Sequence, residues 1–207
     1  MKDLLEYHDK KSKQLEELTM PKTLSTMIPL GTLAPDFNLI DLRTNQKVSY
    51  AKLKSDKATV VMFICNHCPY VIHIQDKLAE VAHFYQTKGV HFIAINSNDA
   101  EQYPEDSPEK MHEQLLQHHF TFPYLHDETQ EVARAYQAAC TPDFYIFDST
   151  QKCVYRGRFD ESNPGNQKPV TGIELTQALD CLLSGKPIDQ NQKPSLGCNI
   201  KWKKTYA

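Results

Sequence analysis

A buried strand, an amphipathic helix and a second buried strand follow one another between residues 58 and 97, and this succession constrains the fold most strongly. The run ATVVMFI is apolar and β-branched over the length of one strand, as is typical of a central strand buried on both faces. Apolar side chains then recur at spacings of three and four and predict a helix: Val71, Ile74, Leu78, Val81 and Tyr85. VHFIAINS has the pattern of another buried strand. The segment therefore predicts a β-α-β unit with parallel strands and a right-handed crossover.

The elements around this unit complete a thioredoxin-like order. FNLIDL predicts a strand before it, while SPEKMHEQLLQHH and ETQEVARAYQ predict helices after it. DFYIFD and CVYRGRFD, separated by STQK, predict an antiparallel hairpin, and GIELTQALDCLL predicts a last helix. We expect an α/β, thioredoxin-like fold with a central mixed sheet flanked by helices. We assign residues 1–27 to an N-terminal helical extension and linker, with a helix over 3–19, residues 28–190 to the domain, and residues 191–207 to a C-terminal tail.

Composition excludes several classes of protein. The 207 residues carry a net charge of −3, which does not suggest a nucleic-acid or membrane surface. We read no apolar leader at the N-terminus and expect a cytoplasmic protein, in a compartment where thiols are mostly reduced. The six cysteines are scattered, apart from Cys65 and Cys68, and do not form a disulfide scaffold.

Cys65 and Cys68 stand at the end of the first buried strand, where open α/β sheets place their sites. We expect Cys65 at the N-cap of the following helix, with Asn66 and His67 in its first turn. Free N–H groups and the helix dipole would then lower the pKa of Cys65, the more exposed sulfur. Cys68 would lie behind it and resolve the mixed disulfide.

Neighbouring residues are expected to tune the pair. His67 adds a group that can carry positive charge and favour the thiolate, and Pro69 falls in the first turn, where a missing N–H costs least. Thr141-Pro142 directly precedes a strand, and we expect a cis peptide bond there, beside the pair, with a free backbone edge for a substrate peptide.

Cys140 stands two residues before Pro142. It is a candidate third redox thiol, and a buried structural residue is at least as good an explanation.

Five segments in one order resemble a known family: LGTLAPDFNLIDL, VVMFICNHCPYV, ACTPDFYIFD, YRGRFDES and LGCNIKW. Together they are similar to the peroxiredoxin-like members of the thioredoxin superfamily, related to the alkyl hydroperoxide reductase and thiol-specific antioxidant group. The resemblance covers roughly residues 28 to 203 and implies a thioredoxin fold with thiol-based redox chemistry. Cys198, within the last segment, receives no role.

The chain departs from the peroxidase pattern of that family, Pro-x-x-x-Thr/Ser-x-x-Cys. Aligned on Cys68, the pattern places Cys65 at the threonine and Val61 at the proline, and residues 140–142 stand where the family carries an arginine. We therefore expect a thiol-disulfide oxidoreductase. A thiol-dependent peroxidase with Cys68 as the peroxidatic cysteine is the alternative, and copper delivery ranks last because the copper-delivery pair has one more residue between its cysteines.

These functional hypotheses predict which ligands and partners the protein has. We expect no cofactor and no metal, a protein disulfide or a small thiol or peroxide as substrate, and a reductant of the thioredoxin or glutathione type. We expect neither a nucleic acid nor a membrane as partner.

Overall fold

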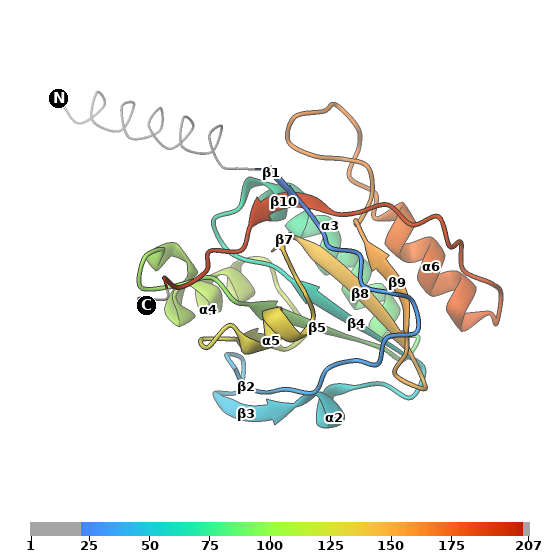
Figure 1. Cartoon of the computed structure of the whole chain (residues 1–207), viewed down its shortest axis with the longest axis horizontal. Helices are drawn as coiled ribbons and strands as arrows, with labels where there is room; N and C mark the ends of the chain where they lie inside the picture. Colours follow the sequence, from blue (N-terminus) through green and yellow to red (C-terminus); the bar gives the residue numbers. More distant parts are fainter. Residues whose placement is uncertain (1–21, 205–207) are drawn as a thin grey trace.

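The computed structural model describes residues 22–204, which form two sheets. The helix expected over residues 3–19 lies outside the described residues. The larger sheet has seven strands in the order β3-β2-β6-β5-β4-β8-β9, and the smaller has three in the order β1-β10-β7. Figure 1 shows the larger sheet twisting through the middle of the molecule, with helices on both sides. The expected fold class is confirmed.

The β-α-β unit forms the centre of the larger sheet. β4 (Ala58–Phe63) and β5 (Val90–Asn96) run parallel, and β6 (Tyr124–His126) continues the parallel set. All six residues of β4 are buried, as expected for a strand covered on both faces. β8 (Asp143–Asp148) and β9 (Cys153–Gly157) form the expected hairpin, which pairs antiparallel with β4. β2 (Asn38–Asp41) and β3 (Gln46–Ser49) complete the far edge.

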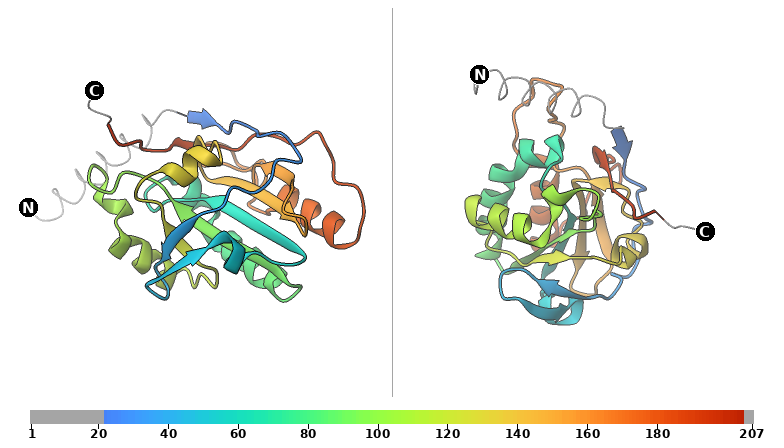
Figure 2. Two further views of the ribbon diagram at one scale, coloured as in Figure 1. Left: turned by 60° about the horizontal axis from the view of Figure 1, so that its bottom comes forward. Right: turned by 90° about the vertical axis from the view of Figure 1, so that its left-hand side faces the viewer.

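Two apolar layers hold the sheet between helices. Val60 and Met62 of β4 face a layer that includes α3 (Pro69–Gln86) and α6 (Ile173–Leu183). Val61 and Phe63 point to the opposite layer, which includes side chains of α2 (Tyr50–Leu53) and α5 (Glu131–Ala135). This alternation follows from the period of two of a strand. The views in Figure 2 show helices above and below the strands.

The remaining helical elements belong to the connection that leads along the chain from β5 to β6. They are the short 3₁₀ helix η1 (Pro104–Asp106) and α4 (Pro108–Gln117), whose N-cap Ser107 accepts a hydrogen bond from the Lys110 N–H. None of the helices within residues 22–204 has the length and apolar character needed to cross a bilayer.

The small sheet joins the two ends of the described chain. β1 (Lys22–Leu24) pairs antiparallel with β10 (Leu196–Asn199), which pairs antiparallel with β7 (Cys140–Thr141), as Figure 1 shows. The division of the chain at residues 27 and 190 stays a prediction. Both outer segments nevertheless contribute a strand, and β10 is packed against the strand that leads to Pro142. The segment expected to be a tail is thus part of the structure around the cysteines.

Candidate active site

Thr141 connects the two cysteines of the motif. Its hydroxyl Oγ1 lies 3.2 Å from the Sγ of Cys65, and its carbonyl oxygen accepts from the Cys68 thiol, also over 3.2 Å. β7 brings Thr141 to the carboxyl end of β4, where the pair lies. The Thr141-Pro142 bond is cis, as expected, so this prediction and its position beside the pair are confirmed.

The helix after the pair begins later than expected. α3 begins at Pro69, and its N-cap is Cys68 in an extended conformation, not Cys65. The proline is the reason: its fixed φ suits the first helical position, and it pushes the preceding residue out of the helical region. The N–H groups of Val71 and Ile72 bond to the Cys68 carbonyl oxygen, over 2.9 and 3.0 Å. The first helical turn therefore closes on the second cysteine of the motif, not on the first.

The acidities of the two sulfurs follow this placement. Burial, the neighbouring Cys68 and the charge of Asp106 raise the pKa of the Cys65 thiol well above its usual range. Burial also raises the pKa of Cys68, but the thiols of Cys198 and Cys65 and the N–H groups of Cys198 and Val71 together lower it well below its usual range. The hydrogen bond from the Cys68 thiol to the Thr141 carbonyl oxygen favours the protonated form of Cys68, but the donors that favour the thiolate outweigh it.

Cys65 was expected to be the exposed and acidic member of the pair. Both residues have 0% exposed surface, and Cys68 is the more acidic. The expectation about exposure and acidity is therefore wrong, because the helix begins one turn later than it assumed.

His67 and Asp106 form an ion pair next to Cys65. His67 Nδ1 lies 2.7 Å from Asp106 Oδ2, and the imidazole ring stacks on Tyr103 with a centroid distance of 5.6 Å and an interplanar angle of 5°. Burial lowers the pKa of His67, but the Asp106 carboxylate outweighs it and raises the pKa above 6.5. Conversely, burial raises the pKa of Asp106, and His67 with the neighbouring donors lowers it overall. His67 therefore holds its proton to a higher pH than an ordinary histidine.

Asp106 is a residue of the candidate site that the sequence reasoning missed. It is fully buried, and it accepts hydrogen bonds from the Asn66 backbone N–H at 2.7 Å, from Asn98 Nδ2 at 2.7 Å and from Asn96 Nδ2 at 3.3 Å. A signal existed, because Asn96 ends β5, the strand that neighbours β4, Asn98 and Asp106 follow it, and the carboxyl ends of parallel strands share one edge. Asn66, expected to tune the pair, contributes through its backbone to this network.

The same residues form the nearest approach to a metal site within residues 22–204. Ligand atoms of Cys65, His67 and Asp106 lie within 4.8 Å of one another. A structural zinc site takes four ligands. Both carboxylate oxygens of Asp106 already contact N–H donors or His67, so a cation would have to displace them. The arrangement fits an ion pair that supports the cysteines better than it fits a metal centre.

β10 covers the backbone edge that was expected to be free. Cys198 pairs with Thr141 in the β10–β7 register, and a Cβ added at Gly197 would lie 2.0 Å from the Thr141 carbonyl oxygen. Only glycine allows β10 to approach this closely. The expectation of an open edge for a substrate peptide is therefore wrong, because a segment nearly 60 residues further along the chain occupies it.

Cys140 faces away from the pair. Successive residues of a strand point to opposite sides, so Cys140 and Thr141 lie on different faces of β7. The Cys140 thiol lies 3.8 Å from the Pro142 carbonyl oxygen, and burial raises its pKa. Among the described residues, no hydrogen bond joins Cys140 to either sulfur of the pair, and its role as a third redox thiol stays without structural support.

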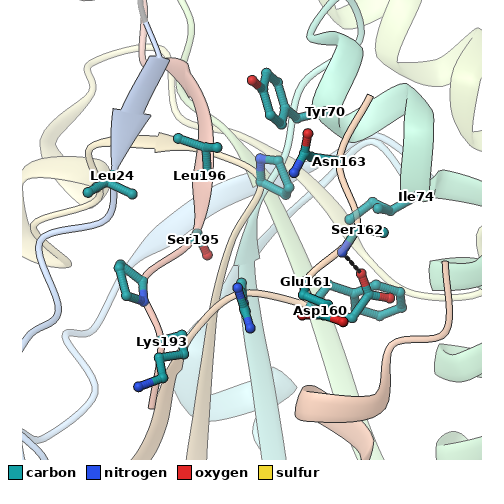
Figure 3. A pocket seen from close by; sticks show the side chains of 14 residues that line it. Leu24, Tyr70, Ile74, Asp160, Glu161, Ser162, Asn163, Lys193, Ser195 and Leu196 are labelled. Carbon is teal, nitrogen blue, oxygen red and sulfur yellow. Dashed lines mark hydrogen bonds between the residues drawn. The ribbon is translucent and has the colours of Figure 1, made fainter. Parts of the chain in front are cut away.

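A cavity of about 280 Å³ lies beside Pro142, on the outer side of the site. Figure 3 shows Leu24 and Leu196 on one side and Tyr70 and Ile74 of α3 on another. The loop after β9 contributes Glu161 and other polar residues. A hollow next to Pro142 that is lined by both apolar and polar side chains is suited to hold part of a substrate.

The comparisons with known proteins bear on the fold and the family of the chain. The AhpC/TSA family pattern matches residues 30–156. An uncharacterized conserved protein from Geobacillus kaustophilus is 58% identical, with a TM-score of 0.89 over 90% of this chain and 99% of that one. A hypothetical protein from Sinorhizobium meliloti is 45% identical, with a TM-score of 0.86 over 88% of this chain and 100% of that one.

A more distant structure shares the fold alone. A secreted disulfide oxidoreductase from Mycobacterium tuberculosis is 17% identical, with a TM-score of 0.54 over 70% of this chain and 95% of that one. No curated protein matches the chain significantly.

Proposed function

The chain belongs to the AhpC/TSA family, and on that premise we propose that it is a thiol-disulfide oxidoreductase whose redox pair is Cys65 and Cys68. One observation carries the proposal: the Thr141 hydroxyl lies 3.2 Å from the Cys65 sulfur, and the Thr141 carbonyl oxygen lies 3.2 Å from the Cys68 sulfur. Both thiols therefore meet at one residue of β7. Such convergence serves chemistry in which each sulfur attacks in turn.

In this mechanism Cys68 acts first. Its thiolate attacks one sulfur of a substrate disulfide, the substrate S–S bond breaks, and the other substrate sulfur leaves as a thiolate that takes up a proton. Cys65 then loses its proton and attacks the Cys68 sulfur of the mixed disulfide. The second substrate thiol leaves, and the Cys65–Cys68 disulfide remains. The substrate has gained the two electrons of the pair, and a reductant of the thioredoxin or glutathione type would restore the dithiol.

His67 supports this order of events. Its raised pKa keeps a positive charge near the pair, and a cation lowers the free energy of a nearby thiolate. Asp106 holds the imidazole in place, and its negative charge contributes to the raised pKa of Cys65. The charge pair therefore favours ionisation of Cys68 over that of Cys65.

Peroxide reduction is the second candidate, and the burial of both sulfurs favours it because a small oxidant needs little room. Here the Cys68 thiolate would attack one peroxide oxygen, form a sulfenic acid and release water or an alcohol. Cys65 would then condense with the sulfenic acid, releasing water.

The arginines argue against an efficient peroxidase. Peroxide cleavage needs donors aimed at the developing oxyanion. The four arginines of the chain have other partners: Arg43 bonds to the Thr121 carbonyl, Arg134 stacks on Trp202, Arg156 bonds to Gln192 and Arg158 pairs with Glu174. This leaves disulfide exchange as the preferred reaction.

Trapping with cysteine variants tests the proposal. The reduced protein is mixed with oxidised glutathione or with hydrogen peroxide, and the products are identified by mass spectrometry. We expect Cys65→Ser combined with Cys198→Ser, which removes both thiols that interact with Cys68, to accumulate a glutathione mixed disulfide at Cys68, and Cys68→Ser to react at least tenfold more slowly. Trapping at Cys65 in Cys68→Ser would reverse the assigned roles. Rapid oxidation by peroxide, with no reaction with the disulfide, would establish the second candidate instead.

Partners and location remain predictions from the sequence. A protein disulfide or a small disulfide is the proposed substrate, and a cytoplasmic location would supply the reduced thiols that the cycle needs. We propose that the cavity beside Pro142 binds the part of the substrate that adjoins its disulfide.

A further inference from the structure

β10 places a third cysteine beside the pair. Cys198 lies directly opposite Thr141 in the β10–β7 register, and Thr141 is the residue whose oxygens contact both Cys65 and Cys68. We propose that Cys198 is a third redox residue of this site, which exchanges a disulfide with Cys68. The inference rests on the proposed redox function of the pair.

The register directs Cys198 toward the reacting sulfurs. Residues directly opposite each other in an antiparallel pair point to the same face, so the Cys198 side chain lies on the same face as that of Thr141. Cys198 is 3% exposed and belongs to the same apolar cluster as Cys65 and Cys68. Cys140 is opposite Asn199 and lies on the other face, so the neighbouring cysteine of β7 does not share this placement.

Cys68 is the middle sulfur of the three. Its thiol donates to the carbonyl oxygen of Thr141, the residue whose hydroxyl contacts Cys65 and which lies opposite Cys198. The thiols of Cys65 and Cys198 both lower the pKa of Cys68. Cys68 is therefore placed to exchange a bond with either neighbour.

β10 is fixed at both ends, so Cys198 stays at the site. At one end the Ser25 N–H donates to the Ser195 carbonyl oxygen at 3.0 Å, and the Ser195 N–H donates to the Ser25 hydroxyl at 2.9 Å. At the other end Lys201 donates to Asn98 Oδ1 at 2.9 Å and accepts from Gln130 Nε2 at 2.8 Å. A covering segment held this firmly is a resident part of the site, not a mobile tail.

The exchange is an isomerisation that needs no outside oxidant. Starting from the Cys65–Cys68 disulfide, the Cys198 thiol loses its proton and its sulfur attacks the Cys68 sulfur. The Cys65–Cys68 bond breaks and the Cys68–Cys198 bond forms. Cys65 leaves as a thiolate and takes up a proton, for which its raised pKa gives it a high affinity. The oxidation state of the protein is unchanged, and the oxidised bond has moved to β10.

Peptide mapping of oxidised variants tests this assignment. Trypsin is unsuitable, because Lys168, Lys186 and Lys193 each precede proline and leave Cys181 and Cys198 in one peptide. A protease that cuts before aspartate separates them: Cys65 and Cys68 fall in 56–75, Cys140 in 127–142, Cys181 in 180–188 and Cys198 in 189–207. The reduced full-length protein is oxidised with diamide, an azo compound that takes two electrons and two protons from a pair of thiols, and is alkylated before digestion.

We expect wild type to lose two thiols, with peptide 56–75 mostly closed on itself and a smaller fraction linked to 189–207. Cys65→Ser and Cys65→Ala should both lose two thiols through a link between 56–75 and 189–207. Adding Cys198→Ser to Cys65→Ser should abolish this link. The matched control, Cys65→Ser with Cys140→Ser, should keep it.

Two failures are distinguishable. A wild-type protein that forms no Cys65–Cys68 disulfide would overturn the proposed function together with this inference. A wild-type protein that forms it, while both Cys65 variants leave Cys198 alkylated and oxidise Cys68 between molecules or to a sulfenic acid, would overturn the role of Cys198 alone.

Discussion

The groups around Cys65 and the groups around Cys68 shift the pKa values of the two thiols in opposite directions. On the side of Cys65, a buried carboxylate, Asp106, lies close enough to oppose ionisation of the sulfur. On the side of Cys68, the first turn of α3 and the strand β10 supply N–H and S–H groups that favour ionisation. The difference teaches that the spacing of a Cys-x-x-Cys motif does not decide which sulfur reacts. The groups that the fold brings to each sulfur decide it.

Removing the Asp106 carboxylate should change the stability more than any other substitution proposed below. Asp106→Ala leaves His67, the Asn66 N–H and the Asn98 amide without their buried acceptor, and breaking a buried pair in this way costs about 3 kcal/mol. We expect the free energy of unfolding, measured by urea denaturation, to fall by about that amount. The pKa of Cys65 should fall as well, because the charge that opposes its ionisation is gone.

Asp106→Asn is the matched control for this change. It keeps an oxygen acceptor for the Asn66 N–H while removing the charge, so we expect a smaller loss of stability and a similar fall in the pKa of Cys65. An unchanged free energy of unfolding in Asp106→Ala would show that the network around Asp106 does not hold this side of the site.

Displacing β10 on the Cys68 side of the site should cause an intermediate loss of stability. Gly197→Ala places a methyl group 2.0 Å from the Thr141 carbonyl oxygen, so β10 must move away from β7. Overpacking of this kind costs about 2 kcal/mol. We also expect iodoacetamide to alkylate Cys68 several times faster, since β10 no longer covers it.

Gly165→Ala is a suitable control for that variant. Its added Cβ would meet only the end of the Asn163 side chain, at 3.3 Å, and both the stability and the alkylation rate should stay close to wild type. Equal alkylation rates in the two alanine variants would mean that β10 does not shield the sulfurs.

The pH dependence of stability should give the smallest effect and separates the two members of the ion pair. The folded-state pKa of His67 is raised, so its contribution is fully present below about pH 6.5, the ordinary value, and is lost as the pH rises through the folded value. The folded-state pKa of Asp106 is lowered, so its contribution is present above about pH 3.8 and is lost as the pH falls through the folded value. The pair is therefore most stabilising between these two ordinary values.

Urea denaturation at pH 5.5 and pH 8.5 measures the histidine contribution. We expect wild type to lose about 1 kcal/mol more than His67→Gln over this interval, because the variant has no proton to release. A parallel loss in both proteins would assign the pH dependence to other groups.

The sequence predicted the central elements well because their signals are local. The apolar run of β4, the spacing of apolar residues along α3 and the turn between β8 and β9 each lie within about 20 residues, where periodicity reports burial directly. Ser107 also marked the start of α4 correctly, because an N-cap residue acts on its own helix. Thr141-Pro142 was placed beside the pair by the expected thioredoxin-like order of the strands and not by a local signal.

The helix start was mispredicted although its signal was also local. Pro69 excludes Cys68 from the helix, a rule that the sequence contained and that the expected N-cap at Cys65 did not apply. Asp106 was a missed signal of the same kind, since it follows a strand adjacent to β4.

The sequence by itself determined the fold class, the position of the cysteine pair at a strand end and the proline beside it. Only the tertiary structure decided that β10 covers β7, that Cys198 lies next to Cys68 and that Asp106 opposes the ionisation of Cys65. Cys198 is 130 positions from Cys68, and no periodicity relates residues so far apart. Their contact depends on a strand pairing that exists only when both ends of the described chain close over the sheet, and a pKa depends on whichever groups that closure brings near the sulfur.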